Sequence, residues 1–116
     1  MTHQMKLVFS AFDKIAKGAK TIELRLNDPK RQKLKVGDII MFACVSNGKT
    51  LTAQVKGLHK FDTFEKLYNA LPLERCGYEK EELQTAHYTD MERFYTKEEI
   101  ARYGVLGIEL KNVQVG

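Results

Sequence analysis

The segment from Gly18 to Leu26 constrains the fold most, because it reads as a strand with two chemically different faces. Side chains alternate between the two sides of a strand. One face carries three aliphatic residues, and we expect it to be buried in the barrel: Ile22, Leu24 and Leu26. The other face carries a hydroxyl, a carboxylate and a guanidinium: Thr21, Glu23 and Arg25. Alternate positions on a strand lie about 6.5–7 Å apart, so one small polar ligand could touch this row. The alternative is a solvated face whose charges serve solubility.

Length and composition indicate a single domain over residues 1–116, large enough to bury a core. The formal net charge of +4 is mildly basic, which favours polyanionic partners. No apolar run approaches the ~20 residues of a membrane helix, so no membrane association is expected. The first residues lack a signal-peptide core, and Cys44 and Cys76 lie far apart in the sequence. Free thiols without an export signal predict a cytoplasmic protein.

Hydrophobic periodicity predicts short strands and helices that follow one another along the chain. Strands are expected at 5–8, around Glu23, and at 39–45, 50–56 and 105–111. The Asn47-Gly48 pair predicts a hairpin between the third and fourth of these. Helices are expected at 10–17, from a cap at Asp62 to Pro72, at 78–85, and from a cap at Thr96 to Gly104. The combination predicts a small, curved α+β barrel.

Two further features carry ligand-binding chemistry. The run from Lys30 to Lys35 has four basic residues among six, and it is either an edge that follows phosphates or a solvated loop. The second half supplies aromatic side chains that could stack an unpaired base or pack in the core: Tyr78, Tyr88, Phe94, Tyr95 and Tyr103. The three histidines are scattered, so no metal site is expected, and no phosphate-binding glycine loop or nucleophile motif is present.

The pattern Gly18-x-Lys20-x-x-Glu23-x-Arg25, followed by Leu34-Lys35-Val36-Gly37-Asp38, resembles that of ASCH domains. The resemblance extends over nearly the whole chain. It implies a PUA-like α+β fold, a small β-barrel of about five to six mostly antiparallel strands surrounded by short helices. It also implies a cleft lined by the motif and suited to RNA or a nucleotide.

One enzymatic branch of the family removes the acetyl group of acetylated cytidine with a lysine, a threonine nucleophile and a glutamate. Lys20 matches that lysine, whereas Glu23 stands where the threonine is expected and Thr21 is one pleat away. Other small members have been linked to RNA cleavage. Three residues could supply the branch's carboxylate, and the sequence does not separate them: Asp62, Glu65 and Glu74.

The leading hypothesis is an RNA- or nucleotide-binding domain without cofactor or metal, its oligomeric state left open. The expected ligand-binding residues are Gly18, Lys20, Thr21, Glu23, Arg25, Lys33, Lys35 and Tyr95. Lys20, Arg25 and the basic run would contact phosphate, Glu23 would accept a hydrogen bond from a base or ribose, and Tyr95 would stack. The first alternative is a hydrolase of RNA or a modified nucleoside, with Glu23 as general base and Lys20 as electrostatic stabiliser. The second alternative is a protein-interaction module.

Overall fold

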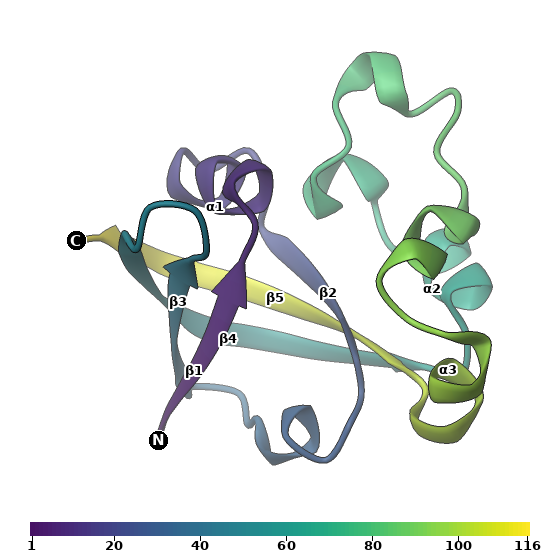
Figure 1. Cartoon of the computed structure of the whole chain (residues 1–116), viewed down its shortest axis with the longest axis horizontal. Helices are drawn as coiled ribbons and strands as arrows, with labels where there is room; N and C mark the ends of the chain where they lie inside the picture. The colour runs from purple at the N-terminus through teal and green to yellow at the C-terminus, as the bar shows by residue number, and fades with distance from the viewer.

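The strands form one five-stranded sheet in the order β1-β3-β4-β5-β2, in a computed structural model that describes all residues from Met1 to Gly116. The strands are β1 (Thr2–Leu7), β2 (Ile22–Leu26), β3 (Ile39–Cys44), β4 (Thr50–Phe61) and β5 (Val105–Val115). Only the β1–β3 pair is parallel, and the other neighbouring pairs are antiparallel. The sheet curls into a half-barrel (Figure 1), so the predicted α+β class and curved, mostly antiparallel barrel are confirmed.

Short helices fill the connections between the strands. The α-helices are α1 (Phe9–Ala16), α2 (Phe64–Ala70) and α3 (Lys97–Tyr103). The 3-10 helices are η1 (Arg31–Lys33), η2 (Leu73–Cys76), η3 (Lys80–Glu82) and η4 (Tyr88–Arg93). In Figure 1, α1 lies on one side of β2, and the segment from α2 to α3 lies on the other. None of these helices has the length and apolar character needed to cross a membrane.

Two helix expectations need correction. The cap of α2 is Thr63 rather than Asp62, because the Thr63 hydroxyl accepts a hydrogen bond from the backbone N–H of Lys66. The helix expected at 78–85 is reduced to the single turn of η3. By contrast, Thr96 caps α3 and Gly104 ends it, as predicted.

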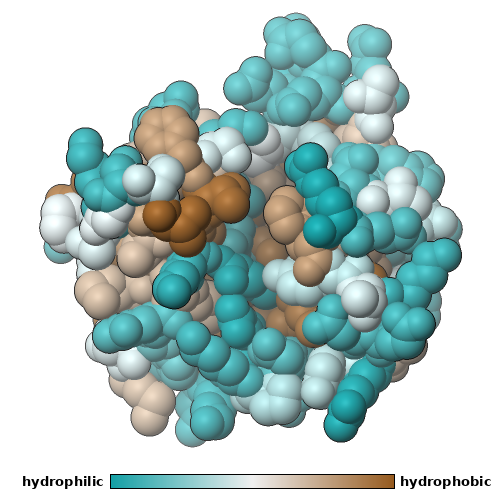
Figure 2. Space-filling view, in the orientation of Figure 1, coloured by the Kyte–Doolittle hydropathy of each residue, from teal (hydrophilic) through white to brown (hydrophobic).

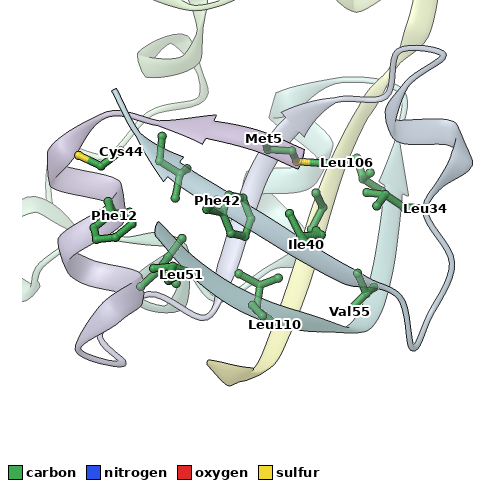
Figure 3. Packing of buried hydrophobic residues seen from close by; sticks show 14 residues of the cluster. Met5, Phe12, Leu34, Ile40, Phe42, Cys44, Leu51, Val55, Leu106 and Leu110 are labelled. Carbon is green, nitrogen blue, oxygen red and sulfur yellow. The ribbon is translucent and has the colours of Figure 1, made fainter. Parts of the chain in front are cut away.

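The buried side chains form two separate clusters. The larger one fills the half-barrel, where side chains from four strands and from α1 point toward a common centre (Figure 3). The smaller one lies between β2 and α2 and is made by Ile22, Leu24, Phe64, Leu67, Cys76 and Val105. The aliphatic face of β2 is therefore buried as predicted, but Ile22 and Leu24 belong to the smaller cluster and none of its residues belongs to the core inside the barrel. Strand alternation defines which residues share a face, but not what packs against it.

The polar face of β2 consequently points to the inside of the half-barrel. Glu23 pairs with Ile108 of β5, and Arg25 pairs with Leu106. Residues directly opposite each other on neighbouring strands share a face, and both β5 residues belong to the larger core. The strands β1 and β2 are the two edges of the curled sheet. Arg25 Nη2 donates a hydrogen bond of 2.6 Å to the carbonyl of Lys6 in β1, and this bond bridges the open seam between the edges.

Candidate functional site

A cleft of about 620 Å³ opens along this seam. Its walls come from the β1–α1 junction, from β2 and from the segment between η2 and η4. Figure 2 shows the corresponding hollow, a hydrophilic strip with apolar surface on both sides. Five cationic side chains line the cleft: Lys6, Lys14, Lys20, Arg25 and Arg93. Three carboxylates also line it: Glu23, Glu82 and Asp90. Since the cations outnumber the carboxylates, the cleft attracts anions.

An ionic triad of Lys20, Glu23 and Arg25 forms the floor of the cleft. Lys20 Nζ lies 3.0 Å from Glu23 Oε1, and Arg25 Nε donates a hydrogen bond of 2.8 Å to Glu23 Oε2. Glu23 is the single charged residue in the chain that is fully buried, with 5% of its surface exposed. Burial alone would raise the pKa of Glu23, but the two cations outweigh it and hold that pKa below its ordinary value of 4.5. The carboxylate is therefore ionised at neutral pH.

The position of Lys20 depends on a glycine in the facing wall. Gly77 follows η2 with a φ of 105°, in the region that favours glycine. A Cβ atom at this position would lie 3.1 Å from Cδ of Lys20, so any other residue would push that side chain aside by a few tenths of an ångström. Lys14 of α1 anchors the same turn, because its Nζ donates a 2.7 Å hydrogen bond to the Gly77 carbonyl. The turn at Gly77 thus leaves room for the Lys20 side chain, whose ammonium is held by Glu23.

A chain of hydrogen bonds runs along the wall that faces α1. The phenol of Tyr78 donates to Asp90 Oδ2 at 2.6 Å and lies 2.7 Å from the phenol of Tyr68. Burial, the bond to Asp90 and the bond to Tyr68 all raise the pKa of Tyr78, so the phenol stays protonated. Asp90 Oδ2 also accepts from the backbone N–H of His87. This network holds η4 and orients a carboxylate at the edge of the cleft.

The structure brings together four of the eight expected ligand-binding residues. Lys20, Glu23, Arg25 and Tyr95 line the cleft, with Tyr95 stacked on Phe64 at a centroid distance of 6.1 Å. Four others lie outside its lining: Gly18, Thr21, Lys33 and Lys35. Gly18 is in the turn after α1, and the two lysines are exposed between β2 and β3.

Thr21 departs from the expected polar row because β2 begins only at the next residue. Its hydroxyl accepts a 2.9 Å hydrogen bond from Arg75 Nε. Arg75 also binds Glu109 at 2.9 Å, and His59 contacts the same carboxylate at 3.1 Å. The bonds from Arg75 and His59 lower the pKa of Glu109 to about 2. Thr21 thus belongs to a second charged cluster, separate from the ionic triad.

The second carboxylate of the cleft is also different from those expected. None of Asp62, Glu65 and Glu74 lines the cleft, whereas Asp90 and Glu82 do. Sequence reasoning missed Asp90, although its position three residues after His87 is that of a helix-capping acid. No sequence signal distinguishes Lys14 from an ordinary exposed helix lysine. The chain has no group of three histidine, cysteine, aspartate or glutamate residues that could hold a metal ion.

Comparison with known proteins shows similarity over the whole fold. The family model described as ASCH domain matches residues 5–114. The crystal structure of the hypothetical protein PH0355 is 33% identical, with a TM-score of 0.79 over 96% of this chain and 98% of that one. The solution structure of PF0455 from Pyrococcus furiosus is 31% identical, with a TM-score of 0.67 and 96% of each chain covered. The ASCH protein of Zymomonas mobilis, at 13% identity, shares the fold alone, with a TM-score of 0.70 over 98% of this chain and 69% of that one. The search of curated proteins gave no match.

Proposed function

The chain belongs to the ASCH family, and from this premise we propose that its cleft binds RNA or a nucleotide. The observation that carries the proposal is the ionic triad, a buried carboxylate shared by two cations on the floor of a cationic cleft. One carboxylate neutralises only one of the two cations, so the triad keeps a net positive charge. Arg25 Nη1 has no hydrogen-bond partner in the chain and is available to a phosphate oxygen.

Each part of the cleft suits a different part of a nucleotide. Lys20 and Arg25 would contact phosphate, and the oxygens of Glu23 would accept from a ribose hydroxyl or a base N–H. Tyr95 would contribute one ring face, since Phe64 stacks on the other. Lys33 and Lys35, which lie outside the cleft, would attract the phosphates of a longer RNA.

The geometry favours binding over hydrolysis. A general base works best when its pKa is near the operating pH, and the two cations lower the pKa of Glu23 instead. The hydroxyl of Thr21 accepts from Arg75 and is outside the cleft. Glu23 is accordingly proposed as a hydrogen-bond acceptor and as the anchor of the two cations.

Fluorescence anisotropy with a labelled single-stranded RNA tests the proposal. We expect salt-dependent binding that weakens steeply between about 50 and 200 mM salt. Lys20→Ala should weaken binding about five- to tenfold and reduce the salt slope by about 0.7. Arg93→Ala, on the facing wall, should act in the same direction without touching the triad. Lys49→Ala is the matched control, because Lys49 is exposed in the β3–β4 hairpin.

Two results would contradict the proposal. One is the absence of RNA binding at about 50 mM salt, where electrostatic attraction is strong. The other is an equal loss of affinity in Lys20→Ala, Arg93→Ala and Lys49→Ala, which would mean that the charge acts without regard to position. Gel analysis of the same RNA distinguishes binding from hydrolysis, since cleavage that Glu23→Gln abolishes would favour the enzyme instead.

A further inference from the structure

Exposed apolar side chains gather at the rim of the cleft. Of the six phenylalanines in the chain, only Phe9 and Phe94 are exposed, by 54% and 51%. Phe94 lines the cleft, and so does Val8, which directly precedes Phe9 and is 49% exposed. Neither phenylalanine belongs to either core cluster. Their exposure therefore has no explanation in the packing of the fold.

The apolar residues stand on two opposite walls. Val8 caps the start of α1 and lines one wall, with Phe9 next to it outside the lining, whereas Phe94 follows η4 and lines the other wall. In Figure 1, α1 and the segment that contains η4 are on opposite sides of β2, and Figure 2 shows apolar surface on both sides of the hydrophilic strip. Single exposed apolar residues are common, but Val8 and Phe94 line one cleft from two different walls, beside its charged floor, and form its two apolar lips.

Cations accompany both lips. The guanidinium carbon of Arg93 lies 5.0 Å from the centroid of the Phe94 ring, which is a cation–π contact. Lys6 precedes Val8 by two residues and also lines the cleft. An exposed aromatic ring beside cations is the combination that binds single-stranded nucleic acid, because a base stacks on the ring and phosphates contact the cations. Phe94 supplies the ring here, and Val8 supplies an aliphatic surface against which the base can pack.

We propose that Val8 and Phe94 form a base-stacking subsite that takes an unpaired base of a single-stranded nucleic acid. The proposal rests on the proposed function and specifies the form of its ligand. The base lies between the two lips, above the ionic triad, while the phosphates on either side contact Arg93 and Lys6. A cleft of about 620 Å³ is within the usual range for a small ligand and has room for a nucleotide. A base in a duplex is already covered on both faces by its stacked neighbours, so only an unpaired base can enter.

The test compares variants at the lips by RNA binding. Phe94→Ala should weaken the binding of a single-stranded RNA about five- to 100-fold, the range of one stacked base. The salt slope should not change, because no charge is removed. Phe94→Trp should restore affinity, because it keeps a flat ring. Val8→Ala should weaken binding by a smaller factor, and Val45→Ala is its control, since Val45 is 60% exposed and outside the cleft.

Measurements with other ligands identify which form of nucleic acid binds at the subsite. A blunt RNA duplex should bind the protein more weakly than the single strand, and Phe94→Ala should not weaken it further. A 2-aminopurine in the single strand should lose fluorescence on binding to the parent protein, as stacked bases do, and lose less with Phe94→Ala. A mononucleotide that binds as tightly as the strand would overturn the assignment to a strand.

The outcomes separate this inference from the proposed function. Salt-dependent binding that Lys20→Ala weakens but Phe94→Ala leaves unchanged would overturn the stacking subsite alone. Absence of any binding to RNA would overturn both. A loss in Phe94→Ala that Phe94→Trp does not restore would also count against stacking, because it would show that the ring face is not what the ligand uses.

Discussion

Glu23→Gln is the sharpest perturbation of the ionic triad, because it removes the central charge and keeps the shape of the side chain. The parent carboxylate accepts from Lys20 at 3.0 Å and from Arg25 at 2.8 Å. The amide of glutamine has one accepting oxygen, and its NH₂ group would face the other cation. The variant therefore loses at least one charge-assisted hydrogen bond and leaves two largely buried cations, Lys20 and Arg25, without a counter-charge.

The magnitude follows from burial. Removing one partner of a fully buried ion pair costs about 3–5 kcal/mol. The side chains of Lys20 and Arg25 are 12% and 13% exposed, so water can solvate part of the uncompensated charge. We therefore expect a loss of about 3 kcal/mol in the free energy of unfolding at pH 7. With an m-value of about 1.5 kcal/mol per molar urea, the unfolding midpoint should fall by about 2 M.

The loss should depend on pH. The folded protein holds the pKa of Glu23 below its ordinary value of 4.5, so the ionised carboxylate stabilises the fold at every pH above that value. This stabilisation disappears as the pH falls through the folded pKa, because the parent protein then also carries a neutral group. The difference between the parent and Glu23→Gln should accordingly be largest at pH 7 and should shrink as the pH is lowered below 4.5.

Urea unfolding, followed by circular dichroism at pH 7 and again at a pH below 4.5, measures the stability difference between the parent and Glu23→Gln. Glu81→Gln is the matched control, since Glu81 is exposed and has no ion-pair partner, and it should change stability by less than about 0.5 kcal/mol. A midpoint shift in Glu23→Gln no larger than that of the control at pH 7 would refute the reasoning. So would a shift of equal size at neutral and acid pH.

Two further predictions concern the glycine that ends α3 and the cysteine that lines the cleft. Gly104→Ala should lower the free energy of unfolding, measured in urea, by about 1–2 kcal/mol more than Gly48→Ala. Both glycines have a positive φ (73° and 72°), so both variants strain the backbone. Only at Gly104 would the new Cβ also clash, because it would lie 2.9 Å from the Phe61 carbonyl oxygen. Equal losses in the two variants would contradict this. Cys76, whose pKa burial raises to about 11, should react with a thiol reagent at pH 8 at least about 100-fold more slowly than a free cysteine, as followed by mass spectrometry of the labelled peptide. Rapid labelling of the folded protein would show that the thiol is accessible.

Local sequence signals predicted most of the regular elements. The alternation in β4, the Asn-Gly turn before it and the Thr96–Gly104 limits of α3 are decided by residues close together in the chain, and the structure confirms them. The α+β class was predicted from the order of these strands and helices along the chain. Three members of the cleft, Lys20, Glu23 and Arg25, were found in the same way, because they are on or next to one strand.

Apart from Tyr95, which the sequence also proposed, the rest of the site depended on contacts that local signals do not encode. Asp90 and Tyr78 reach the cleft because the segment between α2 and α3 packs on β2 through 3-10 turns, which lack a hydrophobic period. Thr21 was misplaced because alternation was extended one residue beyond the strand. Sequence alone likewise could not show that the aliphatic side of β2 meets α2, since that depends on which core lies on each side of the sheet.

The pairing of β2 with β5 has a consequence for the order of assembly. Glu23 is opposite Ile108, so the strand that carries Glu23 and Arg25 finds its only sheet partner some 80 residues later in the chain. During synthesis at about 5–20 residues per second, that strand waits several seconds with both edges unpaired. Its charges then keep an exposed edge soluble until Val105–Val115 has left the ribosome. The charged residues on the floor of the cleft would in this way also protect the newly made chain from pairing with the wrong strand.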